Sequence, residues 1–173
     1  MTIRNRSIFL FVLVGIFLLA RWYLTDPIRG VSQTLGLHLS KGTILQDEDS
    51  HGGFHGDGMR YLEIAFSDTE ELAIIEDIQT GKGWHALPLT DNLDIALYGG
   101  EDATTFISPY ISWDNREPLF PIIENGYYFF LDRHSDSVDE EDDNDLFNRF
   151  SYNFTLAVYD SDTKMLYYCE FDT

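Results

Sequence analysis

The residues best suited to chemistry lie in one octet, His51-Gly52-Gly53-Phe54-His55-Gly56-Asp57-Gly58, which holds two imidazoles, one carboxylate and four glycines. Two histidines and an aspartate within seven residues are enough ligands for a zinc or non-haem iron site if the loop folds back on itself. A third imidazole, in Asp132-Arg133-His134-Ser135, would complete it. The candidate metal ligands are therefore His51, His55, Asp57 and His134.

The same octet has two other interpretations. The backbone N–H groups of Gly52, Gly53, Gly56 and Gly58 would form a ligand loop that binds a phosphate or carboxylate. The loop is not a P-loop, because it lacks the Lys-Ser/Thr pair and leads into a strand pattern, and the acidic residues around it oppose an anion. Glycine also adopts positive φ at little cost, so a tight or bulged connection is the third interpretation, and the one that we favour.

Other reactive side chains are isolated in the sequence. Cys169 occupies one of the alternating apolar positions of its segment, so we expect a small core residue and not a nucleophile. We expect His85 to pack or to lie on the surface. The acidic run 136–145 would bind calcium only weakly, because it lacks the spacing and central glycine of an EF-hand loop. No nucleophile elbow, dinucleotide loop, zinc-ribbon cysteines or kinase signature is present.

The charge of the chain excludes one class of partner. The 173 residues include 11 basic and 30 acidic side chains, with a formal net charge of −19. Four of the basic residues lie within the first thirty positions beside one acid, so the rest of the chain is more acidic still. Such a surface repels nucleic acid and anionic lipid head groups, and it attracts cations or basic proteins. We therefore expect no nucleic-acid binding, and solubility is the simplest use of the acidity.

The N-terminus has the pattern of a membrane anchor. Residues 8–20 are thirteen consecutive residues without a polar side chain, preceded by Arg4 and Arg6 and followed by Arg21-Trp22-Tyr23. At 1.5 Å per residue the run spans about 20 Å, short of the roughly 30 Å hydrocarbon core. Snorkelling of Arg21 and a headgroup position for the two aromatic residues would extend the span to 7–24.

Two alternatives to an anchor stay open, a cleaved signal peptide and a buried hydrophobic helix. A signal peptide has an apolar region of similar length, but Leu18-Leu19-Ala20 lacks the small residue three positions before a cut. No nearby cysteine follows that would carry a lipid. We expect an uncleaved, single-pass anchor in the cell membrane with an extracytoplasmic domain, although two arginines lie on each side of the run and only the amino terminus tips the charge inward.

The rest of the chain predicts a single α+β domain. Alternating apolar residues predict strands at 43–46, 59–66, 127–132, 150–159 and 165–172, the last two forming a hairpin with one apolar face. Ser67-Asp68-Thr69 followed by two glutamates starts a helix that continues to Thr80. The run 136–145, with seven acids in ten residues, is expected to be a solvated, disorder-prone loop.

These patterns predict an antiparallel sheet of about five strands with one main helix against a face. The expected organisation is a basic N-terminal tail at 1–6, a transmembrane helix at 7–24, a linker at 25–42 and an acidic α+β domain at 43–173. Within the linker, 31–40 is compatible with a short helix. The single cysteine cannot form an internal disulfide, and a domain of this size needs none.

The octet, Asp132-Arg133-His134-Ser135 and the closing segment Ser151-Tyr152-Asn153-Phe154-Thr155-Leu156-Ala157-Val158-Tyr159-Asp160 resemble uncharacterised small membrane-anchored proteins of Gram-positive bacteria. Those proteins carry a His-Gly-Gly-Phe-His-Gly-Asp-Gly motif. The resemblance spans most of the chain after the apolar run. It implies an N-terminal anchor and a single α+β domain, and it implies no activity, substrate or cofactor.

The sequence therefore predicts a membrane-anchored extracytoplasmic domain that is not an enzyme and binds a partner or ligand at the cell envelope. Its partners would be the membrane, through residues 7–24, and a basic protein or a cation. One alternative is a metal-dependent hydrolase that uses the His51, His55 and Asp57 loop. Another is an immunity-type inhibitor that neutralises a basic toxin. No cofactor is predicted. If the loop bound one, it would be a divalent metal.

Overall fold

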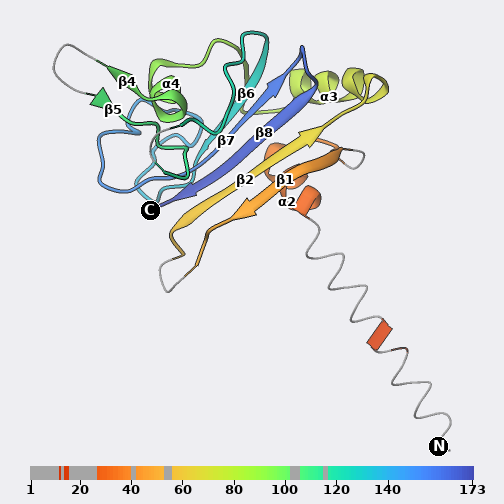
Figure 1. The fold of residues 1–173 in the computed structure, drawn as a ribbon, viewed down its shortest axis with the longest axis horizontal. Helices are drawn as coiled ribbons and strands as arrows, with labels where there is room; N and C mark the ends of the chain where they lie inside the picture. The colour runs from red at the N-terminus through yellow and green to blue at the C-terminus, as the bar shows by residue number, and fades with distance from the viewer. Residues whose placement is uncertain are drawn as a thin grey trace, which may run out of the picture.

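The computed structural model describes residues 12, 14–15, 27–39, 42–52, 56–101, 106–114 and 117–173. Its centre is an antiparallel six-stranded sheet in the order β1-β2-β8-β7-β6-β3 (Figure 1). These strands are β1 Thr43–Asp49, β2 Gly58–Ala65, β3 Trp84–Ala86, β6 Gly126–Asp132, β7 Asn153–Asp160 and β8 Met165–Asp172. A separate two-stranded sheet pairs β4 Gly100–Glu101 with β5 Phe106–Ile107. The described helices are α2 Pro27–Leu35, α3 Asp68–Thr80 and α4 Asp91–Tyr98.

The predicted α+β class with an antiparallel sheet is confirmed. The main sheet has six strands where about five were expected, and three described helices accompany it instead of one. Helix α3 begins as its sequence predicts, because the Ser67 N–H donates to Glu70 Oε2 at 2.8 Å. The unpredicted β3 and α4 lie in the region where prolines interrupt the periodic pattern.

Both faces of the sheet are buried, so the expected hairpin with one apolar face is wrong for the central strands. Seven consecutive residues of β7 are buried. Thr155, Ala157 and Tyr159, on the strand face that looked polar or small, are each 0% exposed. Small and amphipathic side chains on that face leave room for a second layer, which the alternation rule alone does not reveal.

The two faces are covered by different elements (Figure 1). On one face, residues such as Leu62, Tyr159 and Tyr168 pack against α2 and α3. On the other face, residues such as Tyr61 and Cys169 pack against α4 and against irregular chain that contributes Ile111, Phe120 and Leu146. The fold therefore has three layers, with the sheet in the middle.

Part of the expected linker, 25–42, belongs to the domain core. Pro27 begins α2, as proline is able to do at a first helical position, and Gly36 follows its end with a φ of 66°. Val31, Leu35, Leu37 and Leu39 are at most 3% exposed. The Trp84 indole N–H donates to the Leu35 carbonyl at 3.0 Å, which ties α2 to β3.

The two edges of the main sheet differ. β3 has only three residues, whereas β1 has seven and carries the acidic run Asp47-Glu48-Asp49. Most β1 residues are exposed. Arg60 of β2 lies opposite Asp49 and donates through Nε to Asp47 Oδ1 at 3.3 Å.

Among the described residues, no helix is both long and apolar enough to cross a membrane. The expected basic tail, 1–6, lies outside the described residues. So does the expected anchor, 7–24, except for residues 12, 14 and 15.

We expect Tyr159→Phe to stabilise the domain by about 1 kcal/mol, because it removes a buried hydroxyl that lacks a partner. The Tyr159 hydroxyl makes no hydrogen bond within the described part of the chain, and the residue is 0% exposed. The measurement is urea unfolding of the full-length protein with an unchanged m-value. The control is Tyr61→Phe, which removes a hydroxyl within donating distance of Glu63 Oε1 and the Leu119 carbonyl and should destabilise. A loss of stability in Tyr159→Phe would contradict the account.

Candidate functional site

The glycine-histidine octet forms the connection between β1 and β2. Ser50 and Met59 join the two ends of this connection. The Ser50 N–H donates to the Met59 carbonyl at 2.9 Å, and the Ser50 hydroxyl accepts from the Met59 N–H at 2.9 Å. Gly58 has a φ of 155°, and a Cβ there would lie 2.5 Å from His51 Cα. Only glycine permits this approach. The described part of the octet therefore has the contacts of a closed hairpin connection.

His51 lies between two carboxylates. Its Nδ1 is 2.7 Å from Asp49 Oδ1, and its Nε2 is 3.0 Å from Asp172 Oδ2. The backbone N–H of His51 also donates to Asp49 Oδ1 at 2.9 Å. Partial burial acts to raise the pKa of Asp49, but the hydrogen bonds from the His51 backbone and ring hold that pKa below its usual value. Both ring nitrogens of His51 are engaged, which leaves neither for a metal in this arrangement.

Asp172, near the end of β8, joins the octet to Arg133. The Arg133 Nη2 lies 3.0 Å from Asp172, and it also donates to the Phe154 carbonyl at 3.1 Å. Its Nε donates to Thr155 Oγ1 at 3.1 Å. We call His51, Asp172 and Arg133 the loop clamp, because their contacts hold the octet and the chain after β6 to the end of the sheet.

His134 has a different set of partners. Its Nε2 is 3.0 Å from Ser151 Oγ, and its Nδ1 accepts the Asp136 N–H at 3.2 Å. Because Nδ1 accepts a hydrogen bond and is therefore unprotonated, Nε2 carries the proton and donates to the serine. A serine nucleophile needs the opposite tautomer, in which the histidine accepts the hydroxyl proton. This pair therefore positions the chain and does not activate Ser151.

The structure places His51 and His134, two of the four predicted metal ligands, in separate hydrogen-bond networks. His51 belongs to the loop clamp, whereas His134 contacts Ser151. Within the described ranges, no group of three or more His, Cys, Asp or Glu residues is placed to hold a metal ion. His55 and Gly53 lie outside the described residues, so the metal and ligand-loop roles of the complete octet stay predictions.

The chain 133–150, which we call the acidic segment, is held against the sheet by contacts with Asp132 at the end of β6. Arg149 Nη2 lies 2.6 Å from Asp132 Oδ2, and the Asp132 side chain is only 4% exposed. The Asp132 N–H donates to the Glu140 carbonyl at 2.7 Å. The expectation of a disorder-prone loop therefore gives way to an ordered one.

A second attachment lies in the middle of the acidic segment. Asp143 accepts a hydrogen bond from the Thr90 hydroxyl, and the Asn92 side chain donates to the Asp143 carbonyl at 2.8 Å. Leu146 is 1% exposed and packs into the core under α4. Thr90 is the N-cap residue of α4 and also accepts the Leu93 N–H at 3.3 Å. One aspartate and one leucine thus fix a stretch that composition marks as solvated.

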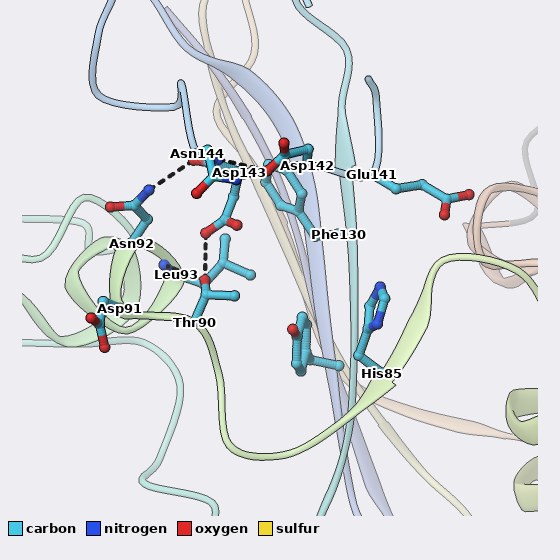
Figure 2. Close-up of a pocket in the computed structure, with 11 residues that line it drawn as sticks. His85, Thr90, Asp91, Asn92, Leu93, Phe130, Glu141, Asp142, Asp143 and Asn144 are labelled. Carbon is cyan, nitrogen blue, oxygen red and sulfur yellow. Dashed lines mark hydrogen bonds between the residues drawn. The ribbon is translucent and has the colours of Figure 1, made fainter. Parts of the chain in front are cut away.

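A pocket of about 530 Å³ lies between the acidic segment, α4 and strands β3 and β6. Figure 2 shows Asp143 and Thr90 hydrogen-bonded on one side and His85 on the other. The His85 ring stacks on Tyr128 with a centroid distance of 5.2 Å and an interplanar angle of 30°. The remaining lining residues are Asp91, Asn92, Leu93, Phe130, Glu141, Asp142 and Asn144.

Comparison with protein-family models, curated proteins and solved structures gives no match, so the site is interpreted from its own geometry. Sequence reasoning missed the pocket. In the sequence Asp143 cannot be distinguished from the acidic residues beside it, and His85 belongs to no motif. The one local signal is Thr90 three residues before Leu93, which is the spacing of a helix N-cap.

We expect Asp172→Asn to lower the free energy of unfolding by about 1–2 kcal/mol, because it leaves His51 and Arg133 without their shared carboxylate. Urea unfolding of the full-length protein measures the change. The matched control is Glu76→Gln on exposed α3 surface, which should alter stability by less than about 0.5 kcal/mol. Equal stability of Asp172→Asn and the control would show that the loop clamp is not stabilising.

Proposed function

We propose that the protein is a single-pass membrane protein whose acidic domain lies outside the cytoplasm and binds a basic protein partner at the cell envelope. The support for the tether is the sequence: an apolar run at 8–20 with arginines on both sides and Trp22-Tyr23 at its end. The support for the binding role is the surface that the acidic segment presents. Catalysis has no part in the proposal.

The observation that carries the binding role is that the acidic segment is fixed while its carboxylates face solvent. The Asp136 side chain is 82% exposed, and Asp139, Glu140, Glu141 and Asp142 are exposed as well. Carboxylates on an ordered backbone lose less conformational freedom on binding than those on a disordered tail. They also speed association with a basic surface.

Two fully exposed apolar residues accompany these carboxylates. Val138 and Phe150 are 99% and 108% exposed. Protein interfaces combine a few apolar anchors with a polar, charged rim, and aromatic residues contribute much of their binding energy. The acidic segment therefore offers both components of an interface with a basic protein.

The position of the acidic segment in the fold agrees with a tether at the N-terminus. Helix α2, which follows the apolar run, packs on the face of the sheet opposite to the one that Leu146 and the acidic segment cover. Anionic lipid head groups repel carboxylates. An arrangement that presents the acidic segment away from the side where the chain enters the domain limits this repulsion.

We expect the full-length protein to stay in the membrane pellet after extraction with alkaline carbonate, because an apolar helix is not released by breaking ionic contacts. Deletion of residues 8–20 should move the protein to the soluble fraction. Recovery of the untrimmed full-length chain in the soluble fraction would refute the tether and would leave the binding role standing.

We expect a photo-crosslinking residue at position 138, in cells, to form an adduct with a basic protein. Neutralising three carboxylates, with Asp139→Asn, Glu140→Gln and Glu141→Gln, should reduce the adduct about ten-fold, because it removes the charge complementarity. The control makes the same change in net charge elsewhere, with Glu48→Gln, Glu76→Gln and Asp162→Asn, and should change the adduct less than about two-fold. Equal yields from the two triple variants would refute the proposed binding surface.

A further inference from the structure

We propose that the pocket beneath the acidic segment is a binding site for an organic cation, an alkylammonium or guanidinium group, recognised by Asp143 and Tyr128. The pocket, of about 530 Å³, is of the size that small ligands or single side chains occupy in proteins. This inference rests on the proposed function, because a basic partner is one source of a cationic ligand.

Asp143 supplies a buried negative charge. The residue is 8% exposed, and its carboxylate accepts a hydrogen bond from the neutral hydroxyl of Thr90. Among the described residues, no Lys, Arg or His side chain lies within ion-pair distance of it. A buried carboxylate is unfavourable without a positive partner, and a bound cation would supply one.

Tyr128 supplies a phenol oxygen beside that charge. The residue is 8% exposed and lines the pocket. Burial, followed by the nearby charge of Asp143, raises the pKa of Tyr128, so the phenol is neutral at physiological pH. An ammonium or guanidinium N–H would satisfy the phenol oxygen and the carboxylate together.

The rest of the lining favours an organic cation over a metal ion. Phe130 is 2% exposed, and His85 stacks on Tyr128, so the pocket has an aromatic floor of the kind that attracts ammonium and guanidinium groups. Figure 2 shows the carboxylates of Asp91 and Glu141 extending away from Asp143. Hard metal ions take six or more oxygen ligands, and the described residues contain no cluster that provides them.

An anionic ligand is disfavoured, although the N-terminus of α4 borders the pocket. The Thr90 hydroxyl already accepts the Leu93 N–H there, and Asp91 and Asp94 lie in the first turn. Asp143 contacts Thr90 from the pocket side. The positive end of this helix is therefore already neutralised by the chain's own side chains.

The same chemistry has two sources, a free amine or a lysine or arginine side chain of the basic partner. The experiment titrates full-length protein in detergent micelles, by calorimetry, with agmatine and separately with a nine-residue peptide that carries one central arginine. At least one probe should bind with one site per chain. Saturation by agmatine assigns a free cation, whereas saturation by the peptide alone assigns a partner side chain.

The variants test whether the pocket is the site. Asp143→Asn should weaken binding at least ten-fold, because the amide carries no charge. The amide oxygen can still accept the hydrogen bond from Thr90. Tyr128→Phe should weaken binding several-fold while preserving the ring stack, and this variant decides the matter if Asp143→Asn does not fold. Glu76→Gln, on the opposite face of the sheet, removes the same charge and should change affinity less than two-fold.

The inference would be overturned if neither probe bound saturably. It would also be overturned if Asp143→Asn and Glu76→Gln lowered the binding affinity equally. Both outcomes are separable from the fate of the proposed function. Crosslinking at position 138 that persists without pocket binding would leave the acidic surface intact and remove only the pocket. Agmatine binding without any crosslinked partner would leave the pocket intact and remove the proposed binding of a basic protein.

Discussion

The burial of β7 and β8 on both faces is the constraint from which the rest of the fold follows. Cys169 lies opposite Tyr61 of β2 on one side and opposite Leu156 of β7 on the other, and it is 0% exposed. Burial raises the pKa of its thiol well above the usual value, so it acts as a small apolar residue. Fully buried central strands are more typical of parallel sheets, because an antiparallel sheet often leaves one face in water. Here both faces of the main sheet must be covered by other residues, and on one of the two faces much of that layer is chain without regular secondary structure.

That requirement explains how a strongly charged stretch becomes ordered. The acidic segment contributes Leu146 to the core, its Asp143 accepts a hydrogen bond from Thr90, and its Arg149 pairs with Asp132 of β6. The other carboxylates of the run are exposed, and the hydrogen bonds that Asp139, Asp142 and Asp145 accept come from within the segment. A few buried contacts thus determine the direction of a whole acidic surface, and the pocket beneath it is the space that the segment spans.

The sequence was informative where local pattern and tertiary packing agree. The β7–β8 hairpin alternates clearly, and α3 has a capping signal at Ser67 and Glu70, so both were predictable. Local pattern carried less information for α2, β3 and α4, which are short and owe their stability to the sheet that they contact. Leu35 and Leu97, for example, become core residues only once the sheet is present.

The candidate site was less predictable than the fold. The octet was identified by its unusual composition, but one of the two carboxylates that contact His51 is Asp172, 121 positions away. Asp143 differs from its neighbours only in facing Thr90, and Ser151 only in facing His134. Contacts between residues distant in the sequence decide these roles, and neither spacing nor composition contains them.

The acidic edge of the sheet has a consequence for how copies of the molecule coexist. β1 is an edge strand of the main sheet, and among the described residues its outer side pairs with no other strand, which makes it a template for the strand of a neighbouring copy. Asp47, Glu48 and Asp49 would then face the same acids of that neighbour. Like charges brought this close repel each other. This repulsion disfavours fibril-like growth from the edge of β1.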